Sequence, residues 1–370
     1  MVECKAIGEI CIPLRKGIIK QGDLKGEGDY PVVNSGVKLY GYYSDYNNEG
    51  NAFKLASRGE YAGFVSYLKD KFWAGGLCYP YRSKDENFCL TKYIYGYLKN
   101  KEPNIMDTLV MRGGIPALNK ADVDKIVIPI PSLPEQTRIV GILDTFTSSI
   151  ENLKQQIAER RKQYEYYRDQ LLDLEGKEVK DIKCWGEFCE MTKGNGVQKT
   201  DFVEEGVGCI HYGQIYTHYG SFTYTTNKFV SQEVFENARK ASKGEIIMTD
   251  TSENVEDICK SVAYLGEDDI AVSNHALIIK HKQNPKFLSY STQTNCFFNQ
   301  KRKVAFGVKV TGIKPEHLAQ IKIYLPSLSE QSRIVSILDT FEASIANLEA
   351  QLMESEKKYE YYRNKLLTFE

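Results

Sequence analysis

The chain lacks the features that mark several common classes of protein. It has no apolar run long enough to span a membrane. Its nine cysteines include no Cys-x-x-Cys pair, which favours reduced thiols over disulfides or zinc and predicts a cytoplasmic protein. No two of its five histidines have the spacing of metal ligands. We therefore expect neither a membrane protein nor a metalloprotein.

The chain also lacks a strong excess of positive charge. Its 48 basic and 49 acidic residues give a formal net charge of −1. The segments 1–131 and 177–326 are mildly basic, and the stretches that follow them are acidic. An autonomous nucleic-acid binder usually carries more positive charge, so a DNA-binding role would leave much of the phosphate contact to partners.

Catalytic motifs are missing as well. We find no P-loop, no glycine-rich adenosylmethionine loop and no nuclease-like cluster of carboxylates with a lysine. The best match to the Asn/Asp-Pro-Pro-aromatic tetrad of methyltransferases is Asn284-Pro285-Lys286-Phe287, which has no second proline. The sequence therefore predicts a protein that is not itself an enzyme.

What the chain does contain is a long internal repeat. Between residues 131–175 and 326–370, 28 of 45 aligned positions are identical. Each copy opens with a helix-capping Ser-x-x-Glu, at Ser132–Glu135 and Ser327–Glu330. Apolar residues then recur at alternating spacings of three and four, the pattern of a coiled-coil seam. The residues expected to pair the two helices are Leu143, Phe146, Ile150, Leu153, Ile157, Tyr164, Leu171, Leu338, Phe341, Ile345, Leu348, Leu352, Tyr359 and Leu366.

The repeats divide the chain into four parts. We expect globular domains at 1–131 and 177–326 and helical segments at 132–176 and 327–370. One polar seam position in each helix, Arg160 and Ser355, can help to fix the alignment. The predicted fold class is α+β: two mixed α/β domains alternate with two long helices, which pair as an antiparallel coiled coil with pseudo-two-fold symmetry.

The two globular segments begin and end alike. Gly8-Glu9-Ile10-Cys11 matches Gly186-Glu187-Phe188-Cys189, and 123–126 resembles 318–321. We expect one fold with different surfaces, a strongly bent sheet and long loops. The strands predicted from β-branched and aromatic residues between turn signals are 6–13, 30–34, 61–67, 125–130, 208–212, 245–248, 261–265, 270–272 and 276–281.

The expected loops are rich in side chains that can bind nucleic acid. Asn and Gln can bond adenine, Arg and Lys can bond guanine or phosphate, and Tyr can contact sugar, phosphate or methyl groups. Such residues also abound in ordinary turns and cores. The candidate DNA-binding residues are Lys16, Asn34, Ser35, Tyr40, Tyr42, Tyr43, Asn47, Arg58, Lys193, His211, Tyr212, Gln214, Tyr216, Thr217, Ser252, Asn299, Gln300, Lys301, Arg302 and Lys303.

With these features in view, the chain resembles the specificity (S) subunit of type I restriction–modification systems. The resemblance covers nearly all of it. Its most specific part is Pro-Ser-Leu-x-Glu-Gln-x-Arg-Ile-Val-x-Ile-Leu-Asp at 131–144 and 326–339. Further support comes from the sequences at 30–36, 210–216 and 309–313.

The resemblance implies a non-catalytic DNA-recognition subunit. Each globular domain would read one half of a bipartite, asymmetric site in double-stranded DNA, and the helices would fix the spacing. Two methyltransferase (M) subunits using S-adenosylmethionine would dock on it, and restriction (R) motor-nuclease subunits using ATP and Mg can join them. No cofactor is expected on this chain. Two alternatives stay open: the specificity subunit of a type II enzyme with a fused nuclease–methyltransferase partner, and a coiled-coil adaptor that does not bind DNA.

Overall fold

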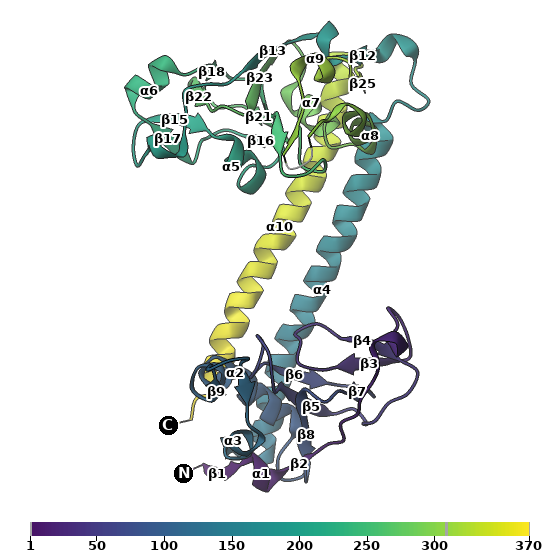
Figure 1. Cartoon of the computed structure of the whole chain (residues 1–370), viewed down its shortest axis with the longest axis vertical. Coiled ribbons are helices and arrows are strands. Elements are labelled where there is room, and N and C mark those ends of the chain that lie inside the picture. The colour runs from purple at the N-terminus through teal and green to yellow at the C-terminus, as the bar shows by residue number, and fades with distance from the viewer. Residues whose placement is uncertain (1, 308–309, 370) are drawn as a thin grey trace. The chain divides into compact units, whose positions relative to one another are not determined.

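A computed structural model describes residues 2–307 and 310–369 (Figure 1), so Lys309 of the motif at 309–313 lies outside the described residues. The chain forms two compact units. Unit 1 holds the residues up to Lys154 and those from Ala350 on, and unit 2 holds Gln155–Glu349. The helices α4 (Leu133–Leu172) and α10 (Leu328–Leu366) are both divided between the units, so that each helix contributes one segment to unit 1 and one to unit 2. Among the residues described, no helix combines the length and apolar character needed to cross a membrane.

The globular part of unit 1 is built around the fully buried strand β5. A four-stranded antiparallel sheet has the order β2-β8-β5-β6, and a three-stranded sheet has the order β4-β3-β7, with β3 and β7 parallel. The elements of this part are β1 (Glu3–Ala6), α1 (Ile7–Ile10), β2 (Cys11–Pro13), β3 (Tyr30–Val33), β4 (Gly41–Tyr43), β5 (Ala52–Ala56), β6 (Val65–Leu68), β7 (Trp73–Ala74), β8 (Cys78–Ser83), α2 (Thr91–Thr108), β9 (Val110–Met111), β10 (Ala117–Leu118), α3 (Lys120–Asp124) and β11 (Val127–Ile130).

The globular part of unit 2 repeats this plan with larger sheets. Their orders are β13-β23-β19-β21-β16 and β14-β17-β15-β22-β18, and β15 runs parallel to β22. The elements are β12 (Ile182–Cys184), β13 (Cys189–Lys193), β14 (Phe202–Val203), β15 (Val207–Ile210), α5 (Tyr212–Thr217), β16 (Phe222–Thr223), β17 (Lys228–Val230), α6 (Gln232–Asn237), β18 (Lys240–Ala241), β19 (Ile246–Thr249), β20 (Thr251–Ser252), β21 (Ser261–Tyr264), β22 (Ile270–Val272), β23 (Ala276–His281), α7 (Pro285–Ser291), α8 (Asn295–Val304), β24 (Thr311–Gly312), α9 (Pro315–Leu318) and β25 (Lys322–Tyr324). We expected a single bent sheet in each unit. Instead, each unit has two sheets of three or more strands, besides two-stranded ones.

Both units also begin and end in the same way. The first strand pairs antiparallel with the last, β1 with β11 and β12 with β25. A short helical turn follows each first strand, where Glu9 accepts a hydrogen bond from the amide of Ala6 and Glu187 one from the amide of Cys184. This capping explains why residues 7–10 form the helix α1 although a strand was expected across 6–13. The expected strand at 61–67 begins only at Val65, because Gly63 turns the chain with a φ of +93°.

The capping boxes of the two long helices form only in part. At α10, the hydroxyl of Ser327 accepts a hydrogen bond from the amide of Glu330. The carboxylates of both box residues instead bind an arginine one turn on. Glu135 binds Arg138 at 2.6 and 2.7 Å, and Glu330 binds Arg333 at 2.7 Å. The arginines therefore compete successfully for the carboxylates that we expected to cap the helix starts.

Within each unit, the segment of α4 contacts the segment of α10. In unit 1, Phe146 stacks on Tyr362 at 5.3 Å and Lys154 pairs with Glu356 at 2.9 Å. In unit 2, the ring of Phe341 stacks on Tyr167 and lies beneath the guanidinium of Arg160. The expected seam residues that are buried are Leu143, Ile150, Leu153, Ile157, Tyr164 and Leu338. The partly buried ones are Phe146, Leu171, Phe341, Ile345, Leu348, Leu352, Tyr359 and Leu366.

A buried glutamine joins each globular part to its long helix. The side chain of Gln136 donates to the carbonyls of Phe88 and Pro131 and accepts from the amide of Leu90. Gln331 occupies the matching place on α10. It donates to Gln283 and to the carbonyl of Pro326, and it accepts from the amide of Asn284. Asn284, from the incomplete methyltransferase-like tetrad, is thus the N-cap of α7.

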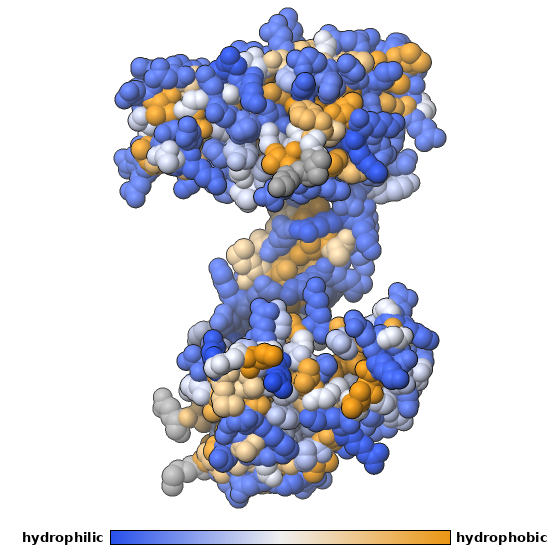
Figure 2. Space-filling model, viewed as in Figure 1, coloured by the Kyte–Doolittle hydropathy of each residue, from blue (hydrophilic) through white to orange (hydrophobic). Residues whose placement is uncertain are grey.

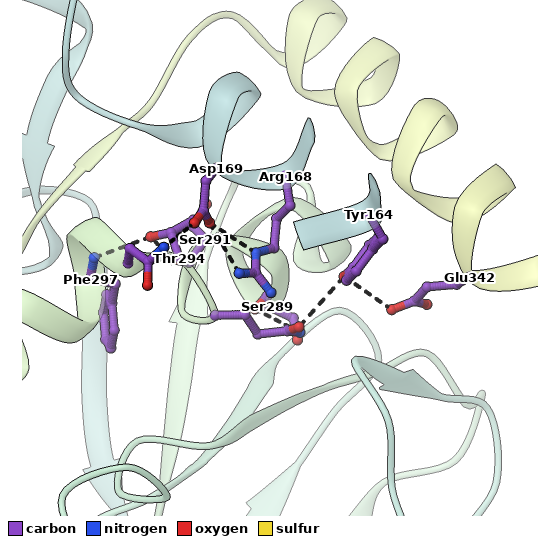
Figure 3. A network of polar contacts seen from close by, with 10 residues as sticks. Tyr164, Arg168, Asp169, Ser289, Ser291, Thr294, Phe297 and Glu342 are labelled. Carbon is purple, nitrogen blue, oxygen red and sulfur yellow. Dashed lines mark hydrogen bonds and ion pairs between the residues drawn. The ribbon is translucent and has the colours of Figure 1, made fainter. Parts of the chain in front are cut away.

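Unit 2 has an additional polar network between its helices (Figure 3). The hydroxyl of Tyr164 on α4 lies 3.4 Å from Glu342 on α10. The hydroxyl of Tyr290 on α7 lies 3.0 Å from the same carboxylate. Arg168 pairs with Asp169 at 3.1 Å, and Asp169 in turn accepts a hydrogen bond from Asn295 on α8. These contacts tie the segments of both long helices to the globular part of this unit.

Candidate nucleic-acid interface

The candidates in the segment that starts at Asn34 and those in the segment that starts at His211 lie at equivalent places in the two units. The loop that starts at Asn34 follows β3, and the segment that starts at His211 follows β15. The residue after the neighbouring parallel strand donates a hydrogen bond to the end of β3 or β15 in the same way. The amide of Gly75 donates to the carbonyl of Val33, and the amide of Ser273 donates to the carbonyl of Ile210. Since these backbone bonds match, Asn34 corresponds to His211.

A buried lysine holds the loop of unit 1. The Nζ of Lys54 on β5 donates to the carbonyls of Asn34 and Gly36 at 2.9 and 3.1 Å. Burial lowers the pKa of Lys54 to about 8. The side chain of Asn34 accepts a hydrogen bond from the amide of Leu77 at 2.8 Å, which joins the loop to the turn before β8. The loop is therefore held to β5 and to the turn before β8. Ser35 at its centre is half-buried.

The other candidates of unit 1 have different environments. The ammonium of Lys16 donates to the carbonyl of Gly76 and lies over the ring of Tyr79. Asn47 exchanges hydrogen bonds with the backbone of Ala74 in β7, which indicates a structural role. Tyr40 and Arg58 are exposed, and Tyr42 and Tyr43 are half-buried.

The segment after β15 is the helix α5 and is not a loop as we expected. His211 caps it, because its Nδ1 accepts from the amide of Gly213 at 3.1 Å. The side chain of Gln214 accepts from the amide of His211 at 2.8 Å, which completes a capping box. Both side chains are buried, and burial lowers the pKa of His211. These two buried side chains therefore stabilise the start of α5.

Beside α5, a buried carboxylate gathers several polar side chains. Asp250 follows β19, is 5% exposed, and lies 2.8 Å from the Nζ of Lys193. It also accepts a hydrogen bond from Thr251 at 2.9 Å, and His275 lies 3.7 Å away. The ring of His275 packs edge-on against Tyr212. The structure thus brings the candidates Lys193 and Tyr212 to one cluster.

Three further candidates close to this cluster bond within the unit. The hydroxyl of Tyr216 donates to the carbonyl of Thr251 at 2.6 Å. The hydroxyl of Thr217 donates to the carbonyl of Gly213, one turn earlier in α5. Ser252 is buried and accepts from the amide of Asn254.

The candidates at 299–303 lie on the helix α8, where we expected a loop. Lys301 is buried, and its Nζ donates to the carbonyls of Glu256 and Ile258 at 2.8 and 2.6 Å. Burial lowers its pKa. Gln300 bonds both backbone groups of Lys322. The exposed members of the group are Asn299, Arg302 and Lys303.

Sequence reasoning missed three polar residues of these sites: Lys54, Asp250 and His275. Lys54 had a signal, since it is a single charge within the apolar run Ala52–Ala56. Asp250 lies two residues after the expected strand at 245–248, and His275 lies directly before the expected strand at 276–281. Polar residues at the ends of neighbouring strands can meet at one edge of a sheet, and that signal could have identified both.

The surface agrees with a polar ligand. In the view of Figure 2, hydrophilic residues cover most of each unit and hydrophobic ones form scattered patches. Among the described residues, no group of three or more His, Cys, Asp or Glu side chains is placed to hold a metal ion. The nine cysteines, all within the described part, are free thiols.

Comparisons with known proteins give independent evidence of the family to which this chain is related. The family described as "Type I restriction modification DNA specificity domain" matches residues 1–160 and 177–355. The specificity subunit of the type I restriction enzyme EcoR124I/EcoR124II from Escherichia coli is 27% identical over 380 residues, covering 96% of this chain and 90% of that protein.

Two solved structures share the fold. The S subunit of a type I restriction–modification system from M. genitalium has a TM-score of 0.66 at 17% identity, covering 100% of this chain and 96% of that one. A chain from a study of complex assembly and conformational transition in the type I restriction–modification system has a TM-score of 0.57 at 16% identity, covering 99% of this chain and 97% of that one.

Proposed function

Because the chain belongs to the family of type I restriction–modification DNA specificity domains, we propose that it is the DNA-reading subunit of a restriction–modification complex. Each globular domain reads one half of a bipartite, asymmetric site. The observation that best supports this is the pair of equivalent segments after β3 and β15, which start from the same backbone bond but differ in local structure and side chains. One framework with two sets of side chains suits a protein that reads two unlike half-sites.

The long helices set the distance between the half-sites. In this proposal the segments 132–176 and 327–370 form an antiparallel coiled coil between domains 1–131 and 177–326. In unit 1, contacts on α10 move backwards from Tyr362 to Glu356 as those on α4 advance from Phe146 to Lys154. In unit 2, they move from Glu349 to Phe341 as α4 advances from Arg161 to Tyr167. Contacts that run in opposite directions favour antiparallel pairing.

The chain acts in the cytoplasm as a non-catalytic subunit, with two methyltransferase subunits and, in the restricting form, motor-nuclease subunits. S-adenosylmethionine, ATP and Mg belong to those partners. The net charge of −1 supports this division of labour, because neutralisation of DNA phosphates requires basic residues that the partners can supply. The exposed candidates that remain for direct DNA contact include Lys16, Tyr40, Arg58 and Lys193.

A DNA titration tests the proposal. Labelled DNA containing the recognition site is titrated at physiological salt with the chain alone and with the chain plus its methyltransferase partner. We expect weak binding by the chain alone and tight, sequence-specific binding by the complex. Equal affinity in the two titrations, or a complex without sequence preference, would contradict the proposal.

A further inference from the structure

The cluster around Asp250 presents two exposed nitrogen-bearing side chains on one buried carboxylate. The side chains of Lys193 and His275 are 51% and 49% exposed, whereas that of Asp250 is 6% exposed. Lys193 lies 2.8 Å from Oδ2, while Thr251 donates to Oδ1 and lies 3.2 Å from the Nδ1 of His275. Each carboxylate oxygen thus orients one of the two exposed side chains.

These contacts assign the imidazole a tautomer. The hydroxyl of Thr251 donates to Asp250, so the proton available between Thr251 and His275 is the one on Nδ1. With Nδ1 protonated, Nε2 of the neutral ring is a hydrogen-bond acceptor. The ammonium of Lys193 is a donor only. The cluster therefore offers one donor group and one acceptor at its exposed edge.

The backbone of His275 is also unusual. Its φ of +64° lies in the left-handed region, where residues other than glycine are uncommon. Glycine would adopt this conformation without strain. The turn itself therefore does not require the histidine side chain.

Unit 1 shows that the fold does not require the cluster. The amide of Ser57 donates to Leu77 as that of Asp250 donates to His275. The carbonyl of Ser57 accepts from the amide of Leu118, as that of Asp250 accepts from Ile313. Serine and leucine thus occupy the places of aspartate and histidine with the same backbone bonds.

We propose that Lys193 and His275, positioned by Asp250, read a G·C base pair in the second half-site, an inference that rests on the proposed function. In the major groove guanine presents the acceptors O6 and N7, and cytosine presents the N4 amino donor. Lys193 donates to the guanine, and Nε2 of His275 accepts from the cytosine. Asp250 already compensates the charge of Lys193, which favours a directed base contact over a phosphate contact.

The test uses the complex with its methyltransferase subunits. Lys193→Gln and His275→Gly are compared with wild type by binding to site libraries and by salt titration, since glycine removes the imidazole and adopts the backbone conformation of His275 without strain. Lys243→Gln is the matched control, since Lys243 is another exposed lysine in an ion pair of unit 2, 2.6 Å from Glu267.

We expect both variants to lose roughly ten- to hundredfold in affinity for the native site and to relax the same base pair of the second half-site. We expect no change in the bases preferred at the first half-site or in the salt dependence of binding. The control variant Lys243→Gln should keep the affinity and sequence preference of wild type. Uniform weakening on all sequences, with the salt slope reduced by about one, would make Lys193 a phosphate contact and overturn the inference. An unchanged motif would also overturn it while leaving the proposed function intact. A wild-type complex that shows no bipartite preference would overturn both.

Discussion

Unit 1 and unit 2 have the same backbone bonds around their candidate reading segments and different side chains on them. Ser57 and Asp250 make equivalent amide and carbonyl bonds, yet one is neutral and the other gathers Lys193 and His275. Backbone bonds thus fix where these side chains stand, and a substitution there changes the chemistry without changing the fold. In the function proposed here, this separation lets one fold serve two half-sites.

The supports beneath the two segments differ as well. In unit 1 the ammonium of Lys54 holds the loop from below, whereas in unit 2 His211 and Gln214 cap a helix. Where the globular parts meet α4 and α10, however, Gln136 and Gln331 make nearly the same bonds. The joints to the long helices are therefore shared, and the differences lie in the segments that carry the candidate DNA-binding residues.

The largest effect should come from breaking a shared joint. Gln136→Leu leaves three partly buried backbone groups without their partner, and Gln331→Leu does the same to two backbone groups and Gln283. At about 1–3 kcal/mol for each unpaired group, we expect each substitution to cost its own unit about 3 kcal/mol or more. Hydrogen exchange resolved by peptide measures this, with the exposed Gln170→Leu as control. Equal loss of protection in both units from either substitution would contradict independent joints.

A smaller effect should separate the units. The hydroxyl of Tyr290 lies 2.7 Å from Asp339 and 3.0 Å from Glu342, and burial together with the bond to Asp339 raises its pKa. Tyr290→Phe removes a donor between two carboxylates, so we expect unit 2 to lose about 2 kcal/mol of stability. Urea unfolding measures the loss, with the exposed Tyr361→Phe as control. An unchanged unfolding midpoint would show that the hydrogen bonds of Tyr290 to Asp339 and Glu342 do not stabilise unit 2.

The smallest effect depends on pH and belongs to unit 1. The pKa of Lys54 is lowered from 10.5 to about 8, so between these values the unfolded chain binds more protons than the folded one. Stability then rises with pH across this window, by about 1 kcal/mol between pH 8 and 9 for this group. Lys54→Met should remove that part of the slope, measured by unfolding at several pH values. A slope identical to that of wild type would show that Lys54 titrates normally.

The sequence predicts the large features of the fold because they rest on periodicity. The seam spacing predicts α4 and α10, and the strands at 270–272 and 276–281 match β22 and β23. The helix α8 was missed, because the polar run 299–303 has the composition of a loop. Its start depends on the hydroxyl of Thr294, which accepts from the amide of Phe297, and on the burial of Phe297. Such tertiary burial overrides local composition.

The candidate site was predictable only in outline. The list of polar loop residues included Lys193 and Tyr212, but it also included Gln300 and Lys301, whose polar groups bond the unit's own backbone. Residue type alone does not distinguish these cases. Asp250 and His275 meet because β19 and β23 are adjacent in the sheet. The sequence marks both residues as lying near strand ends, but it does not say which strands pair.

Replacing one domain tests the central claim most directly. Because β1 and β11 pair as β12 and β25 do, residues 181–325 can be replaced by a second copy of residues 3–130. Methylation mapping with the methyltransferase partner should then give a palindromic site, with the first half-site present twice in inverted orientation at unchanged spacing. A motif that keeps the original second half-site, or a site read without two inverted halves, would contradict the account of two independent readers on one framework.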